Sequence, residues 1–235
     1  MKTLYNDLGQ PVGFPLPDWN PPQFPEIKSM QGYFCQLEPI NDSHLNDLYE
    51  AFCKCDEGTW TYLPYGPFAE YKDFEDWAKN YCFKKDPQFY AVVDKKCGKA
   101  VGMISYLRIT PAFGCVEVGH VHFSMALRKT PAATETMFLL MDNAFSMGYR
   151  RYEWKCDALN QPSCNAAERL GFIFEGIFRQ AIVYKGRNRD TAWYSITDLE
   201  YAKLKPAYER WLDAANFDEN GNQKTSLREF IADCR

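Results

Sequence analysis

The spacing of hydrophobic and polar positions changes along the chain in a way that predicts a succession of helices and strands. Apolar residues recur every third or fourth position where a helix is expected and every second position where a strand is expected. Strands are predicted at residues 33–38, 89–94, 100–109, 114–127 and 152–156, and a strand pair at 172–184 and 190–196. Helices are predicted from 41–42 to 52, at 69–83, 131–147 and 163–170, and from about 199 onward. Because hairpins interrupt the strict alternation of a doubly wound sheet, a mixed α/β fold is expected.

A proline-rich segment precedes the first predicted strand. Residues 11–25 contain six prolines together with Phe14, Trp19 and Phe24. Because proline fixes φ and lacks an N–H group, we expect an extended arm here rather than a helix or a central strand. The aromatic residues favour an arm that packs on the domain; a proline-rich ligand for another protein is the alternative. The expected organisation is an arm at 1–30, one domain at 31–200 and a helical tail at 201–235.

Composition narrows the classes of function. The 235 residues are 46% hydrophobic and 16% aromatic, so the chain can bury a sizeable core. Its net charge of −4 argues against a nucleic-acid-binding protein, which would be basic. No apolar run approaches the roughly 18 residues of a membrane span, and the first residues lack the apolar region of a signal peptide. The nine cysteines show no repeated spacing. A cytoplasmic protein with reduced thiols, without a membrane or nucleic-acid partner, is therefore expected.

Candidate chemistry is concentrated between Glu117 and Asp190. Arg128 and Lys129 stand directly before the predicted helix that begins at Pro131. The start of a helix presents unpaired N–H groups and the positive end of its dipole, which together suit a pyrophosphate. An ordinary amphipathic helix preceded by two solvated cations is the alternative.

The same stretch resembles the GNAT acetyltransferases, and most of all the RimJ/RimL type that acetylates protein N-termini and other primary amines. The resemblance covers roughly residues 31–200. It rests on an Arg-x-x-Pro-x-Ala helix start at Arg128, Asn-x-x-Ser at Asn160, Leu-Gly-Phe at Leu170 and Glu-Gly-x-x-Arg-Gln at Glu175, in this order and separated by strands and helices. It implies a single domain with a twisted, mixed, mostly antiparallel sheet flanked by helices. It also implies direct transfer of an acetyl group from acetyl-CoA to a primary amine, with CoA as product and no metal.

By this resemblance, the helix start holds the pyrophosphate of acetyl-CoA. The implied cofactor-binding residues are Val121, Phe123, Arg128, Lys129, Thr130, Ala132, Ala133, Thr134, Asn160 and Ser163. Asn160 would orient the pantetheine arm, and Ser163 would protonate the departing thiolate. The chain departs from the family pattern at three positions. Pro131 replaces the central glycine of the pyrophosphate turn, Ala167 replaces a catalytic tyrosine, and Ile182 replaces a glutamate base.

The acceptor amine must be neutral to attack, so a base or a water chain has to remove its proton. Glu117 is the first candidate base, followed by Glu175 and His120; each carboxylate could instead pair with an arginine such as Arg179. The predicted acceptor-binding residues are Trp60, Tyr62, Tyr65, His120, Glu175 and Trp193. A hydrophobic cluster is the alternative for the aromatic residues of the 60–68 loop. His120 and His122 share a strand face, but no third ligand accompanies them, so no metal site is expected.

The predicted function is therefore acetyl-CoA-dependent N-acetylation, with Ser163 and Glu117 as catalytic residues. The acceptor is a small molecule, such as an aminoacyl nucleotide, a polyamine or an amino sugar, or else a protein N-terminus. The departures at Pro131, Ala167 and Ile182 favour the rival, a non-catalytic acyl-CoA-binding or protein-interaction module on the same fold. Whether the chain forms a homodimer is left open.

Overall fold

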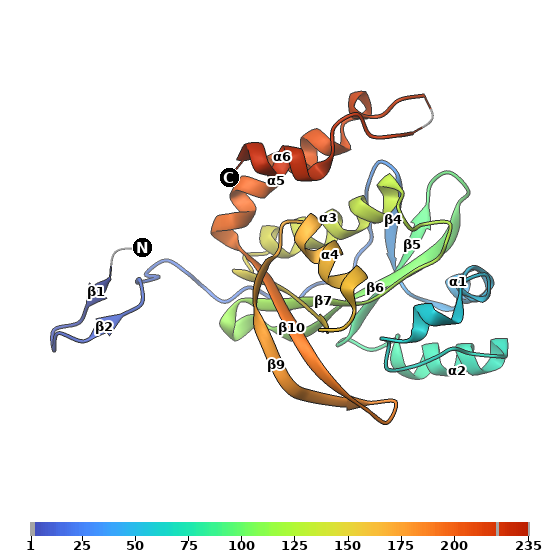
Figure 1. The fold of residues 1–235 in the computed structure, drawn as a ribbon, viewed down its shortest axis with the longest axis horizontal. Coiled ribbons are helices and arrows are strands. Elements are labelled where there is room, and N and C mark those ends of the chain that lie inside the picture. Colours follow the sequence, from blue (N-terminus) through green and yellow to red (C-terminus); the bar gives the residue numbers. More distant parts are fainter. Residues whose placement is uncertain (1–2, 220, 235) are drawn as a thin grey trace.

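The computed structural model describes residues 3–219 and 221–234, and its centre is an eight-stranded sheet (Figure 1). The strand order is β3-β4-β5-β6-β7-β8-β10-β9. Neighbouring strands are antiparallel except for β7 and β8, which are parallel. The strands of this sheet are β3 (Met30–Gln31), β4 (Cys35–Pro39), β5 (Gln88–Asp94), β6 (Lys99–Thr110), β7 (Cys115–Phe123), β8 (Arg151–Asp157), β9 (Ile173–Tyr184) and β10 (Arg187–Thr197).

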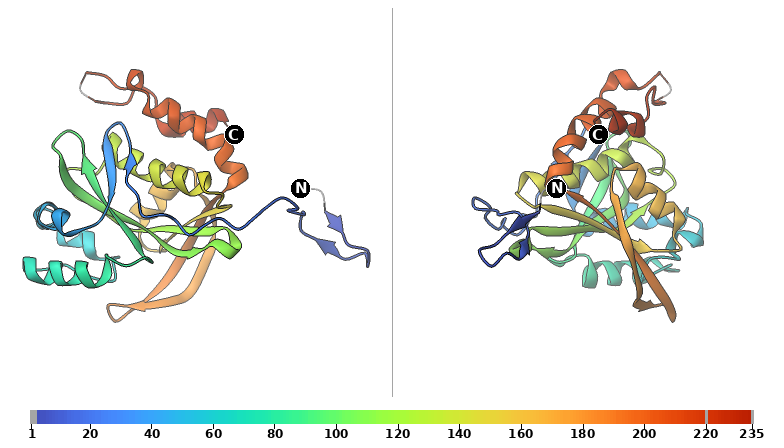
Figure 2. Two further views of the ribbon diagram at one scale, coloured as in Figure 1. Left: turned by 180° about the vertical axis from the view of Figure 1, so that it is seen from behind. Right: turned by 60° about the vertical axis from the view of Figure 1, so that its left-hand side comes forward.

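Helices cover both faces of the sheet (Figures 1 and 2). One hydrophobic cluster lies beneath α1 and α2, and a larger one lies beneath α3, α5 and α6. The helices are α1 (Asp42–Cys53), α2 (Tyr71–Tyr81), α3 (Pro131–Ser146), α4 (Gln161–Arg169), α5 (Asp198–Leu212) and α6 (Leu227–Cys234), with 3₁₀ turns at Glu57–Trp60, Pro111–Phe113 and Ala214–Asn216. This architecture confirms the predicted mixed α/β fold with a mostly antiparallel sheet flanked by helices.

The central strand β5 shows why its sequence lacks polar alternation. Phe89 and Ala91 join the cluster beneath α1 and α2, whereas Tyr90 and Val92 join the cluster on the other face. A strand that is buried on both faces has to be apolar at consecutive positions. The apolar run therefore marks the middle of the sheet, between the two helical layers.

The predicted strand at 114–127 ends earlier in the structure, at Phe123. The N–H groups of Leu127 and Arg128 both donate to the carbonyl of Ser124, at 3.1 and 3.0 Å, and so form a turn. Apolar residues continue through this turn because Leu127 is buried in the core. Its burial, rather than a strand, explains the hydrophobic pattern that suggested a longer β7.

The N-terminal arm has two parts. Pro22 and Pro25 are buried on the body, where the carbonyls of Gln23 and Pro25 accept hydrogen bonds from Tyr149 and Gln88 at 3.2 Å. The preceding residues form a small hairpin, β1 (Leu4–Tyr5) with β2 (Pro11–Val12), which projects away from the body (Figure 2). The segment that lies on the body is thus shorter than the whole proline-rich arm.

The C-terminal helices are joined to the body through α3. Phe138 of α3 stacks on Tyr208 of α5 with ring centroids 5.1 Å apart. The Tyr208 hydroxyl donates to the Leu170 carbonyl at 2.7 Å, and the hydroxyl of Tyr201 donates to Asp142 at 2.5 Å. These contacts make α5 a cover for α3.

A buried carboxylate joins α3 to the first strands of the sheet. Glu135 accepts the backbone N–H groups of Tyr33, Phe34 and Cys35 at 2.5–2.8 Å and is almost completely buried. The turn approaches so closely that a Cβ atom at Gly32 would collide with this carboxylate. Glu135 therefore fixes the position of α3 relative to β4, and with it the start of that helix.

We expect Glu135→Ala to lower the free energy of unfolding by about 3 kcal/mol or more, because three N–H groups lose a charged acceptor in a buried place. Gly32→Ala should also destabilise the chain. Urea denaturation of the purified variants measures both effects. The exposed Glu209→Ala on α5 is the matched control and should change stability by no more than about 0.5 kcal/mol. A loss for Glu135→Ala as small as that of the control would contradict this account.

Candidate active site

The only parallel strand pair of the described sheet stays together for four residues. Cys115 to Val118 of β7 pair with Arg151 to Trp154 of β8. Beyond them, β7 is bound only to β6 and β8 only to β10. The two strands therefore separate into a wedge, along which each presents backbone N–H and C=O groups to a ligand.

A bulge at His120 accompanies this separation. The register between β6 and β7 slips by one residue between the pairs Ser105–Gly119 and Met103–His122. His120 itself has a φ of +51°, in the left-handed region. An extra residue of this kind turns a strand and redirects its side chains. As a result His120 and His122 both point to the face that α1 and α2 cover, where their rings contact Phe89 and Phe52 respectively.

The start of α3 follows directly after β7. The Thr130 hydroxyl caps the helix by accepting the N–H of Ala133 at 3.3 Å. Among the described residues, the N–H groups of Lys129 and Ala132 meet no acceptor. The Nε of Arg128 donates to the Phe123 carbonyl at 2.8 Å. Free N–H groups, a helix dipole and two cations thus come together at the end of β7, which suits an anion.

The start of α4 follows β8 across the wedge. The Asn160 side-chain oxygen accepts the N–H of Ser163 at 3.2 Å and so caps this helix. The indole Nε1 of Trp154 donates to the Ser163 hydroxyl at 3.0 Å. Because an indole N–H can only donate, Ser163 is the acceptor in this bond, and its own proton remains available to another group.

Glu117 lies beneath the point where the strands part. It is 3% exposed, and its two oxygens are 2.6 Å from Arg108 Nη1 and 2.9 Å from Lys155 Nζ. Burial raises the pKa of this carboxyl, whereas the two cations act in the opposite direction. The Lys155 ammonium is also 2.7 Å from Glu153 and 3.8 Å from the centre of the Trp193 ring. Glu117 is therefore held by charges from two neighbouring strands.

Glu175 has a structural partner, although not the predicted Arg179. Its oxygens are 2.7 and 2.5 Å from the guanidinium of Arg151, and the Ser195 hydroxyl donates to it at 2.8 Å. The Arg151 hydrogen bonds hold the pKa of this carboxyl below its usual range. Arg151 also contacts Glu153, 2.7 Å away. A ladder of alternating charges thus crosses the sheet from β6 to β9.

The two histidines of β7 are enclosed by aromatic residues. Tyr65 and Tyr81 place their hydroxyls 3.1 and 3.4 Å from the two ring nitrogens of His120. His122 stacks on Phe52 and meets the edge of Trp60, and its Nδ1 has no partner among the described residues. Burial lowers the pKa of His120 to about 4 and that of His122 to about 3. Both imidazoles are therefore neutral at pH 7.

The aromatic loop at 60–68 is tied to two elements on the β8 side of the wedge. The Tyr62 hydroxyl donates to the Leu159 carbonyl at 3.2 Å, just before α4. From the tip of the β9–β10 hairpin, Lys185 donates to the carbonyls of Trp60 and Gly66 at 2.8 Å, and Arg187 donates to that of Thr61 at 2.9 Å. The loop is therefore fastened to α4 and to the hairpin.

A family model of the acetyltransferase (GNAT) domain matches residues 35–173, which is more than half of the chain. The chain belongs to the GNAT acetyltransferases. It is similar to a GCN5-related N-acetyltransferase of Brucella melitensis, with 46% identity over 92% of this chain and 100% of that chain and a TM-score of 0.90. A probable GNAT-family acetyltransferase of Chromobacterium violaceum is 40% identical over 82% of this chain and 98% of that chain, with a TM-score of 0.77.

A more distant likeness shows the fold alone. An acetyl transferase of Salmonella typhimurium that modifies the N-terminal serine of a 50S ribosomal subunit protein is 19% identical over 72% of this chain and 98% of that chain, with a TM-score of 0.60. No curated protein matches the chain in sequence.

GNAT acetyltransferases use acetyl-CoA, and the residues at the wedge fit it. The start of α3 keeps the Lys129 and Ala132 N–H groups free for an anion, although Pro131 has none. Unpaired strand edges suit the two amides of the pantetheine arm. Val121, Phe123, Arg128, Thr130 and Ala133 lie together on β7 and at the start of α3, and Asn160 and Ser163 lie at the start of α4. Thr134 is buried inside the helix, where its hydroxyl accepts from Arg169 at 3.2 Å.

The predicted acceptor residues do not form one open pocket. Trp60 is 5% exposed and belongs to the core beneath α1 and α2, as the hydrophobic-cluster alternative proposed. Tyr65 and His120 form a pair, and Trp193 lies under Lys155. The sequence did not identify Arg108, Lys155, Lys185 or Arg187 as residues of the candidate site. The alternating charges at 151, 153 and 155 were a sequence signal for the ladder of alternating charges. No local sequence pattern indicated that the β9–β10 hairpin contacts the 60–68 loop.

Residues 3–219 and 221–234 contain no group of three or more His, Cys, Asp or Glu side chains placed to hold a metal ion. Within the same ranges, each helix is too short or too polar to cross a membrane.

Because both buried histidines are neutral, we expect the folded chain to lose stability at low pH. The unfolded chain binds protons at these side chains near pH 6.5, but the folded chain binds them only near pH 4 and 3. Lowering the pH from 7 to 4 should therefore reduce the free energy of unfolding, by about 3 kcal/mol for each histidine. Urea denaturation at several pH values measures this loss. His120→Gln and His122→Gln should each weaken the pH dependence; variants with the native dependence would refute the burial argument.

Proposed function

We propose that this protein transfers an acetyl group directly from acetyl-CoA to a primary amine, as a RimJ/RimL-like N-acetyltransferase of the cytoplasm. The proposal rests on one arrangement: an anion site at the start of α3 and a serine with an available proton at the start of α4 lie on the two sides of the β7–β8 wedge. Residues 31–200 would form the catalytic domain, flanked by the arm at 1–30 and the tail at 201–235.

Acetyl-CoA would lie along the wedge and supply the activated acetyl group. The N–H groups of Lys129 and Ala132, together with Arg128, would bind the pyrophosphate. Because Arg128 already donates through Nε to the Phe123 carbonyl, its terminal nitrogens are oriented before the anion arrives. The Asn160 side-chain oxygen is used by the helix cap, so only its amide NH₂ remains to orient the pantetheine arm.

Ser163 would donate its proton to the departing sulfur. The Trp154 indole fixes the hydroxyl oxygen from one side, which leaves the proton directed elsewhere. Trp154 is therefore proposed as a positioning residue. This serine takes the role for which other members use a tyrosine at the position of Ala167, a residue that is fully buried here.

Glu117 would accept the proton of the amine, directly or through water. A buried carboxyl with a raised pKa is a better proton acceptor near neutral pH than an exposed one. Arg108 and Lys155 hold its position. Glu175 is less suited to this role, because the Arg151 hydrogen bonds lower its pKa, whereas burial raises that of Glu117. His120 is neutral and remains the second candidate base.

The acceptor would approach from the face that the aromatic loop covers. Tyr62, Tyr65 and His120 present hydroxyl and imidazole groups there. Because the aromatic loop at 60–68 is fastened to its neighbours, it suits a small planar amine as the acceptor. A protein N-terminus is the alternative acceptor. The rival function, acyl-CoA binding without catalysis, is favoured by the departures from the family pattern at Pro131, Ala167 and Ile182.

The test combines an amine screen with one substitution. The purified chain, given acetyl-CoA, should acetylate at least one member of a panel of aminoacyl nucleotides, polyamines, amino sugars and peptide N-termini, as detected by thiol release and mass spectrometry. Ser163→Ala should lower kcat about 100-fold and leave KM for acetyl-CoA within about twofold, because general acid catalysis contributes on this scale.

Ser146→Ala, at an exposed position near the end of α3, is the control and should match the native enzyme. An unchanged kcat for Ser163→Ala would remove this serine from the mechanism. Binding of acetyl-CoA without acetylation of any amine would favour the non-catalytic module.

A further inference from the structure

The N-terminal hairpin reaches away from the body with apolar side chains exposed. Within the described chain, the hydrogen bonds of residues 3–13 all stay inside that segment. The exposed large apolar residues before position 18 are Leu4, Tyr5, Leu8, Val12, Phe14 and Leu16, with Leu8 82% exposed. The arm is anchored where Arg150 lies over the rings of Phe14 and Trp19. A segment of this kind gains little from its own body and is built to contact something else.

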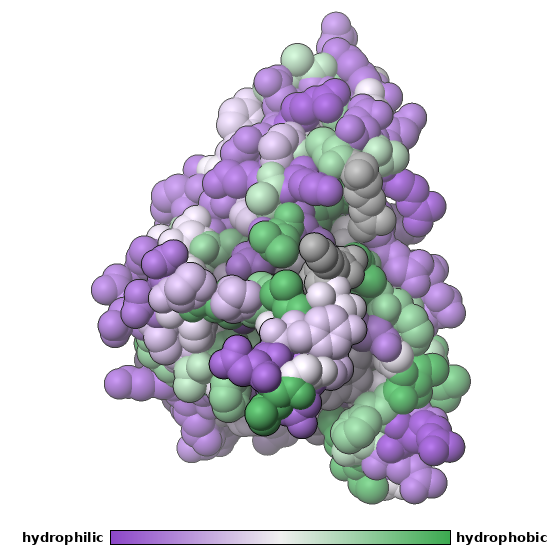
Figure 3. Space-filling model, turned by 90° about the vertical axis from the view of Figure 1, so that its left-hand side faces the viewer, coloured by the Kyte–Doolittle hydropathy of each residue, from purple (hydrophilic) through white to green (hydrophobic). Residues whose placement is uncertain are grey.

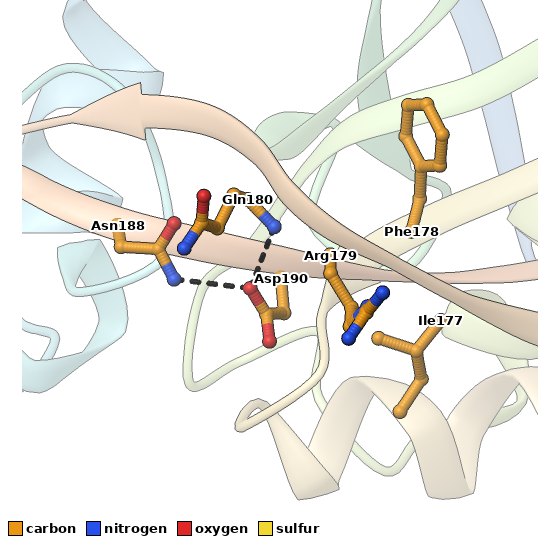
Figure 4. A pocket seen from close by; sticks show the side chains of 6 residues that line it. All are labelled: Ile177, Phe178, Arg179, Gln180, Asn188 and Asp190. Atoms are coloured by element: carbon orange, nitrogen blue, oxygen red, sulfur yellow. Dashed lines mark hydrogen bonds between the residues drawn. The ribbon is translucent and has the colours of Figure 1, made fainter.

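A second apolar surface lies on β9, one of the two edge strands of the sheet. All of its large apolar residues from Ile173 to Phe178 are close to half exposed or more, and Val183 is 79% exposed. Ile177, Phe178, Arg179, Gln180, Asn188 and Asp190 line a surface hollow of about 610 Å³ here (Figure 4). Asp190 stiffens the hollow by accepting from the Gln180 N–H at 2.8 Å and from Asn188 at 3.0 Å.

The arm and β9 lie on the same side of the molecule. In Figure 1 the arm and the beginning of β9 are both at the left of the body, and the β9–β10 hairpin then runs downward to a tip below the middle of the body. Figure 3 views that side directly and shows apolar groups near its centre, where the arm points at the viewer. Others gather at the lower right, where the right-hand view of Figure 2 places the β9–β10 hairpin. The segment from Gly13 to Asp18 spans at most about 20 Å when extended, so the hairpin can reach a neighbour on this side.

The charges of the arm and of the β9–β10 surface indicate what each of them binds. Residues 1–18 carry two acidic residues, Asp7 and Asp18, and one basic residue, Lys2. The β9–β10 segment from 173 to 190 carries four basic and two acidic residues. Of these, Glu175 is paired with Arg151, while Lys185 and Arg187 donate to neutral carbonyls and keep their positive charge. The arm is therefore slightly acidic and the strand edge basic, and the two apolar surfaces are complementary in charge.

We propose that two copies of this chain form a twofold dimer in which the arm of each copy docks on the β9–β10 surface of the other. Twofold symmetry uses each of these two surfaces twice. Eleven apolar side chains in each copy, about half exposed, offer an area of the order of 1,000 Å². A stable interface needs about 800 Å² from each partner. Because the same hairpin fastens the aromatic loop through Lys185 and Arg187, the dimer would also support the acceptor side of the active site.

Light scattering after size exclusion tests the assembly. The full chain should have twice the mass of 27.3 kDa. Leu8→Asp and Val183→Asp alter residues that are mostly exposed in the protomer, so each should leave folding intact, as circular dichroism can check, and weaken dimerisation at least tenfold. Tyr33→Asp is the matched control: Tyr33 is 68% exposed at the β3–β4 turn, at the opposite edge of the sheet, and its replacement should leave the dimer unchanged.

Mixing the two weakened variants tests whether the arm of one copy docks on the β9–β10 surface of the other. A heterodimer of Leu8→Asp with Val183→Asp contains one arm–strand contact with native residues on both sides. The mixture should therefore dimerise more strongly than either variant alone. A monomeric full chain, a dimer that tolerates both substitutions, or a mixture no stronger than its components would each overturn the proposal. These readouts are independent of acetylation.

Discussion

The site depends on the separation of one parallel strand pair. β7 and β8 are held together at 115–118 and 151–154, and there the sheet is continuous. Beyond that point β6 and β10 hold the two strands apart, while α3 and α4 begin where the strands end. A wedge in a sheet leaves backbone groups unpaired, so the fold retains it only with support from both sides. The same geometry presents two helix starts to one ligand.

Two buried polar systems supply this support. Glu135 fixes α3 against the first strands by accepting three N–H groups. On the other face, the charges of Arg108, Glu117, Lys155, Glu153 and Arg151 alternate across β6, β7 and β8. Removing one member of such a ladder would leave its buried neighbour uncompensated. The candidate base is therefore part of the structural framework, which limits how far it can move during a reaction.

Local sequence patterns were sufficient to predict most of the helices and strands. The helix predicted at 131–147 is found at 131–146, because proline, the Thr130 cap and the apolar spacing all act locally. The end of β7 was missed because Leu127 is buried within a turn. The aromatic loop was recognised, but its attachment to Lys185 and Arg187 joins residues more than a hundred positions apart. Contacts between side chains of different strands, such as Arg108 with Glu117 or Arg151 with Glu175, leave no local pattern.

We propose that the wedge and the start of α3 bind acetyl-CoA. The most direct measurement is the melting temperature of the chain with acetyl-CoA, with CoA and with ATP. A ligand at about 100 times its Kd adds about 2.7 kcal/mol to the stability of the folded state, which raises Tm by several degrees. We predict this shift with acetyl-CoA and CoA and none with ATP. The absence of a shift at millimolar acetyl-CoA would contradict the account.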